Sequence, residues 1–156
     1  MHPDFAAYLN SLAPSFERLI ASEPFRFADM PHVRLPNAGV YVFSEGDTHM
    51  YVGRSNSIRR RLQNHCRPGS KENQAAFAFL LARRETGLLK ASYRPDGSRR
   101  HLMTQESFRT VFDAQKARLR TMDIRVVEET NPNRQALLEM YVSIALKTLH
   151  NDFDNH

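Results

Sequence analysis

Two tripeptides flanking a tight turn constrain the fold of this chain most. Gly39-Val40-Tyr41 opens one apolar stretch, Tyr51-Val52-Gly53 closes another, and a Gly-Asp pair at residues 46–47 separates them. β-Branched and aromatic residues favour strands, and a Gly-Asp pair between two such runs is typical of a hairpin turn. The spacing therefore predicts strands at residues 40–44 and 49–53, with the two tyrosines on neighbouring strands. Taken alone, the tripeptides also suit an ordinary hairpin.

The segments around this hairpin have mainly helical spacing. We expect helices and one further strand at residues 3–22 (interrupted by Pro14), 57–67, 72–85, 104–120, 124–127 (the strand) and 132–147. Asn131-Pro132 is a strong helix start, because an N-cap residue precedes proline at the first helical position. Three prolines between residues 24 and 36 predict an extended connection, and residues 94–97 read as a turn. The sequence thus predicts an α/β fold with a small, three-stranded, mainly antiparallel sheet flanked by helices.

We expect one structural domain overall, in which residues 1–36 form an N-terminal helical extension packed on residues 37–156. At 156 residues the chain is long enough to bury its own core. Cys66 is the only cysteine, which excludes an internal disulfide and a cysteine-based zinc cluster, and we interpret it as a small packing residue. The absence of a long apolar run, a signal peptide or a Walker motif predicts a soluble, cytoplasmic protein without a membrane partner or a nucleotide cofactor.

Positive charge is concentrated in the middle of the chain. Residues 51–125 carry seventeen basic and six acidic side chains, whereas residues 1–50 and 126–156 each have a net charge of −3. A surface that follows a phosphate backbone requires such a concentration of cations. We therefore expect DNA to bind segment 51–125, the alternative being a dispersed basic face in solvent.

The last predicted helix contains a carboxylate in an apolar setting. Glu139 is the only charged residue between Gln135 and Leu146. A helix that is apolar nearly all round is typically buried, and a carboxylate inside it needs a partner. One interpretation is a ligand for a single Mg²⁺, with Mn²⁺ as a substitute. The other is a buried salt bridge with an arginine.

The two tyrosines and four later residues form a set that can be recognised by its order along the chain. After the two tyrosines, Arg61 and His65 lie one turn apart on the basic helix at residues 57–67, and an asparagine follows Glu139 by twelve positions. Over residues 38–155 this arrangement resembles the GIY-YIG nuclease family, whose name spells the two tripeptides. The resemblance implies a catalytic set of Tyr41, Tyr51, Arg61, His65, Glu139 and Asn151. Asn151 could instead be a helix C-cap, with Asn155 as an alternative for its role.

The resemblance implies a metal-dependent DNA endonuclease that hydrolyses phosphodiester bonds by a single-metal mechanism. Glu139 would hold Mg²⁺ and Arg61 would hydrogen-bond the phosphate. Tyr41 would orient or deprotonate the attacking water. Tyr51 and His65 would shape the same pocket, with His65 as a proton relay or a phosphate contact. Asn151 would orient neighbouring groups or the DNA backbone.

Four more arginines are expected to bind the substrate. Arg54 stands where repair-type members have lysine, and it can stabilise charge but cannot act as a base. The others are Arg59, Arg60 and Arg67, all in or next to the basic helix. We expect no second DNA-reading domain, so site selection would come from the basic middle, the N-terminal extension or a homodimer. The rival function is a non-catalytic nucleic-acid-binding module on the same fold.

Overall fold

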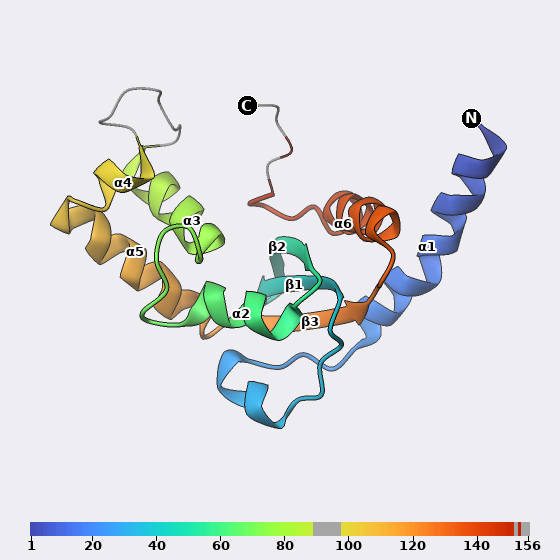
Figure 1. Ribbon diagram of the computed structural model, residues 1–156, viewed down its shortest axis with the longest axis horizontal. Helices are drawn as coiled ribbons and strands as arrows, with labels where there is room; N and C mark the ends of the chain where they lie inside the picture. The colour runs from blue at the N-terminus through green and yellow to red at the C-terminus, as the bar shows by residue number, and fades with distance from the viewer. Residues whose placement is uncertain (89–97, 152, 154–156) are drawn as a thin grey trace. The chain divides into compact units, whose positions relative to one another are not determined.

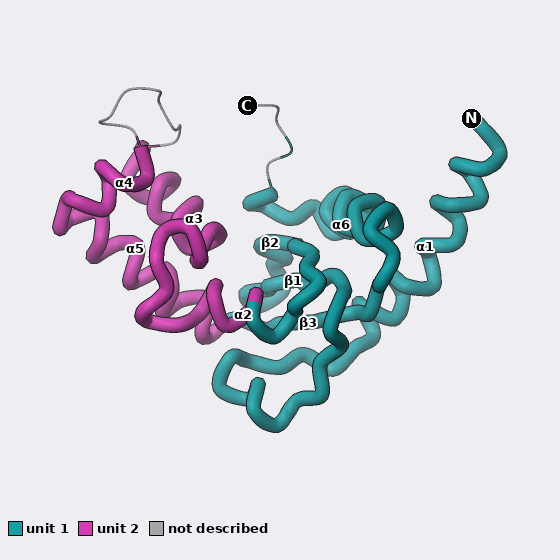
Figure 2. Tube along the Cα trace, in the orientation of Figure 1, with its two compact units in different colours: residues 1–60, 122–156 teal, residues 61–121 magenta. Residues whose placement is uncertain are grey.

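The computed structural model describes residues 1–88, 98–151 and 153. The chain divides into two compact units, unit 1 with residues 1–60 and 122–156 and unit 2 with residues 61–121 (Figure 2). Sequence analysis placed its internal boundary at residue 36 instead. The division lies elsewhere because the N-terminal helix shares the core of the sheet, whereas residues 61–121 form a core of their own.

Unit 1 is built on an antiparallel sheet with the strand order β2-β1-β3 (Figure 1). β1 spans Gly39–Glu45, β2 spans Thr48–Ser55 and β3 spans Asp123–Glu128. The turn between β1 and β2 is at Gly46, whose φ of 58° favours glycine. The strands occur where the sequence indicated, each one or two residues longer at its ends. The predicted α/β fold with a three-stranded sheet and flanking helices is confirmed.

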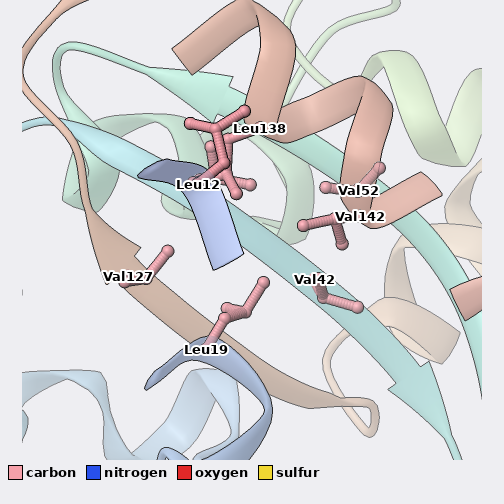
Figure 3. Close-up of a cluster of buried hydrophobic side chains, with 8 residues drawn as sticks. Leu12, Leu19, Val42, Val52, Val127, Leu138 and Val142 are labelled. Carbon is pink, nitrogen blue, oxygen red and sulfur yellow. The ribbon is translucent and has the colours of Figure 1, made fainter. Parts of the chain in front are cut away.

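Two helices cover one face of this sheet. α1 spans Pro3–Ala21 and α6 spans Pro132–Leu146. Their leucines and valines pack against alternate strand residues in one cluster (Figure 3), formed by Leu12, Leu19, Val40, Val42, Val52, Val127, Leu138 and Val142. Successive strand side chains point to opposite faces, so Tyr41 and Phe43 lie on the other face of β1. The core thus fixes the side of the sheet on which each candidate residue emerges.

The helix boundaries of unit 1 follow local capping. Asn131 Oδ1 accepts hydrogen bonds from the Asn133 and Arg134 amides, as expected of an N-cap. α1 is continuous through the exposed Pro14 rather than broken there. The expected extended connection before β1 contains a 3₁₀ helix, η1 (Phe27–His32), because Asp29 accepts a hydrogen bond from the Arg26 amide and closes a local turn.

Unit 2 is helical. α2 spans Ile58–Cys66 and crosses from unit 1 into unit 2, followed by α3 (Ala76–Thr86), α4 (Arg99–Leu102) and α5 (Glu106–Leu119). Phe79 packs edge-on against Phe108 and Phe112, with ring centroids 5.2 and 5.9 Å apart. The turn expected at residues 94–97 lies outside the described residues. Among those described, no helix has the length and apolar content needed to cross a bilayer.

Candidate active site

The glycine of the second tripeptide lies beneath the tyrosine of the first. Tyr41 pairs with Gly53 across β1 and β2, and a Cβ added to Gly53 would overlap the Oη and Cζ atoms of Tyr41. The phenol ring therefore crosses β2 at a point where only a glycine leaves room. This contact places the Tyr41 hydroxyl above β2, which is an edge strand, although the side chain is only 1% exposed.

Tyr51 emerges on the same face of the sheet. It is opposite Phe43 in the ladder, and Phe43 meets the Tyr41 ring edge-on at 5.9 Å between centroids. Directly paired residues of an antiparallel ladder point to one face. The structure thus brings both tyrosines to β2 on the face opposite the valine core, with Tyr51 partly exposed and Tyr41 buried.

Glu139 approaches β2 from the other face. It lies on α6, and its Oε2 accepts a hydrogen bond from Arg54 Nε at 3.0 Å. Arg54 pairs with Val40 in the ladder, which places it on the face that α6 covers. The carboxylate is 20% exposed and the guanidinium 44%, so the pair contributes about 0–1 kcal/mol to stability.

This helix corrects one expectation and bears on another. α6 is not buried all round, since Met140 and Ile144 are exposed, and the partner of Glu139 in the folded chain is an arginine, which was the alternative to a metal ion. The reason is that α6 covers one face of a narrow sheet. Only every third or fourth of its residues reaches the core, namely Gln135, Leu138 and Val142. An apolar composition alone could not reveal the exposed stripe.

Asn151 binds the backbone of β2 at the centre of the second tripeptide. Its Oδ1 accepts from the Val52 amide and its Nδ2 donates to the Val52 carbonyl, both at 2.8 Å. Oδ1 also accepts from Thr148 Oγ1, which in turn shares a hydrogen bond with Ser143 Oγ on α6. Asn151 is therefore not the C-cap of α6, a position that Lys147 occupies in the left-handed conformation. Asn155 lies outside the described residues.

Sequence reasoning missed Thr148 and Ser143, the two hydroxyl residues that orient the Asn151 amide. Their only sequence signal is a serine and a threonine just before the asparagine, which is too common to be informative. The segment also continues along β2, because the Leu149 and His150 amides donate to the His49 and Met50 carbonyls. The C-terminal segment thus covers the edge of β2 beside Tyr51.

The arginines of α2 have different surroundings. Arg59 donates to the Met30 and Val33 carbonyls, each at 2.7 Å, so its guanidinium holds η1 against the start of α2. Arg60 and Arg67 are exposed. Arg61 is partly buried and lies one turn before His65, and both belong to unit 2. The structure therefore gathers Tyr41, Tyr51, Arg54, Glu139 and Asn151 at β2 in unit 1 and Arg61, His65 and Arg67 in unit 2.

His65 and Cys66 are both buried completely. Burial, reinforced by the charge of Arg61, lowers the pKa of His65 to about 3, so its imidazole is neutral at physiological pH. The suggested contact of His65 with phosphate stays an expectation, and with a neutral ring it would be a hydrogen bond rather than an ion pair. Burial raises the pKa of the Cys66 thiol to about 12 against the opposing charge of Arg120. Cys66 is thus a packing residue, as predicted.

The metal expectation can be tested on the donor set. Among the described residues, no group of three or more His, Cys, Asp or Glu side chains could hold a metal ion. Glu139 supplies one partly exposed carboxylate at β2. Mg²⁺ commonly takes one or two protein carboxylates and completes its shell with waters and substrate phosphates. The donor set therefore fits a weak Mg²⁺ site on Glu139 alone and does not fit a cage such as zinc requires.

Comparison with known proteins gives no further assignment. The sequence matches no protein-family model, and neither curated proteins nor solved structures give a significant match. What this site does must therefore be argued from its own residues.

Proposed function

We propose that this protein is a Mg²⁺-dependent endonuclease that hydrolyses phosphodiester bonds in DNA, with a site of the GIY-YIG type. The observation that carries the proposal is the convergence on β2. The Tyr41 hydroxyl above Gly53 and Tyr51 lie on one face of β2, the Arg54–Glu139 pair lies on the other face, and Asn151 binds the backbone of Val52, so all of them meet residues 51–54 of this one strand.

Hydrolysis of a phosphodiester has simple requirements. The oxygen of a water molecule bonds to phosphorus while the bond to the 3′ oxygen breaks, so the water loses one proton and the 3′ oxygen gains one. Negative charge grows on the equatorial oxygens during this exchange. A site therefore needs a cationic group at the phosphate, a group that orients the water, and rigid placement of both.

The residues at β2 meet these requirements in the proposal. Arg54 donates its guanidinium to the phosphate oxygens, a planar fork that suits them. Tyr41, held by the close fit over Gly53, orients the water through its hydroxyl group. Asn151 fixes the position of β2 at this point, because its side-chain amide hydrogen-bonds both the backbone N–H and the backbone carbonyl of Val52. A Mg²⁺ ion on Glu139 would supply Lewis-acid stabilisation of phosphate charge. The role that the resemblance implies for Arg61, which belongs to unit 2, stays an expectation.

One observation favours a second candidate, a nucleic-acid-binding module without catalysis. Arg54 already compensates the Glu139 carboxylate, so the folded chain needs no metal there. In a module of this kind the pair would be purely structural. In the endonuclease, Arg54 would turn from Glu139 to the phosphate when DNA and metal bind.

Incubation with nucleic acids separates the two candidates. Supercoiled plasmid, branched DNA and RNA are incubated with the protein in Mg²⁺, Mn²⁺ or EDTA, and products are resolved on gels. The endonuclease predicts metal-dependent conversion of DNA to nicked or linear forms and none in EDTA. Binding of DNA without cutting in either metal would leave only the binding module.

A further inference from the structure

Net charge is distributed unequally between the two units. Unit 2 holds thirteen basic and five acidic residues, a net charge of +8, whereas unit 1 holds nine and twelve, a net charge of −3. The positive charge predicted for the middle of the chain thus belongs mainly to the inserted helical unit. Unit 1, which carries the two tyrosines and Glu139, is acidic by comparison.

Several cations in unit 2 bind backbone carbonyls or aromatic rings. Arg120 donates to the Cys66 carbonyl at 2.7 Å, and Lys116 donates to the Pro68 and Ser70 carbonyls at 2.6 and 2.8 Å, although Lys116 also pairs with Asp113 at 3.0 Å. Arg99 donates to the Glu72 carbonyl at 3.1 Å and lies over the Phe79 ring. Carbonyls and ring faces satisfy a cation but carry no net negative charge. The positive field of the unit is therefore retained.

These bonds shape the loop between α2 and α3. Three cationic side chains bind carbonyls between residues 66 and 72, and the Ser70 amide closes a turn onto the Arg67 carbonyl. Arg67 and Lys71 are exposed on this loop, while Arg99 at the start of α4 meets it at Glu72 and the exposed Arg100 follows. We call Arg67, Lys71, Arg99 and Arg100 the loop patch. It presents four cations on a backbone that is held in place.

The aromatic side chains of unit 2 indicate which nucleic acid suits this patch. Proteins that hold single strands usually stack bases on exposed aromatic rings. The described aromatic residues of unit 2 are Phe77, Phe79, Phe108 and Phe112, and all are buried. Cations on a fixed loop, in a unit whose described aromatic rings are all buried, suit the regular phosphates of a duplex instead.

We infer that unit 2 is a duplex-DNA-binding insertion whose loop patch contacts the phosphate backbone independently of base sequence. This inference deepens the proposed function, on which it rests for the identity of the substrate. It assigns affinity mainly to unit 2 and chemistry to β2 in unit 1. The inference also changes the set of expected phosphate contacts. Arg59, which binds the Met30 and Val33 carbonyls, is left out, and Lys71, Arg99 and Arg100 are added.

Salt-dependent binding of the full chain tests this inference. The patch variant carries Arg67→Gln, Lys71→Gln and Arg100→Gln, and spares Arg99 because its bond to Glu72 shapes the loop. The control variant carries Arg18→Gln, Arg34→Gln and Lys147→Gln, which lowers the net charge equally through exposed residues of unit 1. Fluorescence anisotropy with labelled DNA duplex in EDTA gives the dissociation constant from 50 to 200 mM salt.

The inference predicts a loss confined to the patch variant. Each lost phosphate contact lowers the slope of log affinity against log salt by about 0.9, so the slope should fall by up to about 2.7. The control should keep the wild-type slope. Equal slopes in the two variants would overturn the inference, as would tighter wild-type binding of duplex RNA or single-stranded DNA than of duplex DNA.

The loop patch and the proposed endonuclease can each fail without the other, and the results distinguish the two failures. A patch variant that binds like wild type while the wild type cuts DNA with Mg²⁺ would overturn the loop patch and leave the endonuclease standing. A wild type that shows the patch-dependent slope but never cuts would support the patch and remove the endonuclease. A wild type that binds no DNA at all would overturn both.

Discussion

Unit 1 and unit 2 use their cations in different ways. In unit 1 three arginines pair with carboxylates, namely Arg54 with Glu139, Arg134 with Glu129 at 2.6 Å and Arg26 with Asp123 at 3.5 Å, while Arg59 and Arg125 donate to backbone carbonyls. In unit 2 the cations mostly meet backbone carbonyls and aromatic rings, although Lys116 also pairs with the exposed Asp113. Both arrangements satisfy the cation locally. Only the second leaves net charge for a partner.

The difference between the two units favours separate roles for them in the proposed function, with chemistry in unit 1 and attraction of DNA in unit 2. A phosphodiester-cutting site needs a carboxylate for a metal ion, and acids nearby would repel DNA unless cations elsewhere attract it. In this proposal the cationic unit 2, which begins within α2 and ends before β3, would supply that attraction without adding cations to unit 1. The following predictions test each side of the comparison, ordered by the size of the expected effect.

Lys116 tests whether carbonyl-bound cations stabilise unit 2. It is 3% exposed, donates to two carbonyls and lies over the Phe112 ring. Lys116→Met keeps the apolar stem and removes the charged hydrogen bonds, so we expect the free energy of unfolding to fall by about 3 kcal/mol in urea denaturation. Lys147→Met, at an exposed lysine, should change it by less than about 0.5 kcal/mol. Equal effects would mean that Lys116 does not hold the loop.

Gly53 tests the close fit at the candidate site in unit 1. Gly53→Ala adds a methyl group that overlaps the buried Tyr41 phenol, so the ring or the strand must move. We expect a loss of about 1–3 kcal/mol in the free energy of unfolding. Gly69→Ala is the matched control, because a Cβ there meets nothing within 4 Å. A Gly53→Ala protein as stable as this control would show that Tyr41 is not fixed over β2.

His65 makes stability depend on pH through unit 2. Its pKa is about 3 in the folded chain and 6.5 in the unfolded chain, so between these values only the unfolded chain binds the proton. The free energy of unfolding therefore falls as the pH is lowered through 6.5. At pH 5.5 it should be about 1.4 kcal/mol below its value at high pH, where both chains are deprotonated at this residue. His65→Gln should remove this part of the slope in urea titrations. Parallel slopes for both proteins would contradict a buried neutral His65.

Arg54 tests the pairing that distinguishes unit 1. Arg54→Gln removes the cation that competes for Glu139, and it should change the free energy of unfolding by no more than about 1 kcal/mol. Mn²⁺ binding without DNA, followed by electron paramagnetic resonance of the free ion, should then tighten by up to about fivefold. Adding Glu139→Gln should abolish that gain. An unchanged Mn²⁺ affinity in Arg54→Gln would show that the pair does not occupy the metal position.

Much of this architecture could be predicted from local patterns. Alternation gave the strands, Asn131-Pro132 marked the start of α6, and Gly87 ends α3 in the left-handed conformation that glycine allows. The candidate residues of unit 1 were also identifiable, because the tripeptides and the lone charge of α6 are visible in the sequence.

Long-range partners could not be predicted in this way. Arg54 and Glu139 are 85 positions apart, and Asn151 binds Val52 across 99 positions, so no local period connects them. Lys116 looked like any surface lysine, yet it is buried against a loop 46 positions earlier. The exposed face of α6 could not be predicted, because the composition of a helix does not show how many of its faces pack against other elements.

Replacement of Glu139 by glutamine tests the central claim most directly. The change keeps the shape and one hydrogen bond to Arg54 while removing the charge that would hold Mg²⁺, and the pair it weakens is too exposed to threaten folding. Cleavage of plasmid DNA in Mg²⁺ is measured together with thermal unfolding and duplex binding. The account predicts a fall in cleavage rate of at least about 100-fold, with melting temperature and DNA affinity preserved. A stable Glu139→Gln protein that cuts DNA at the wild-type rate would contradict it.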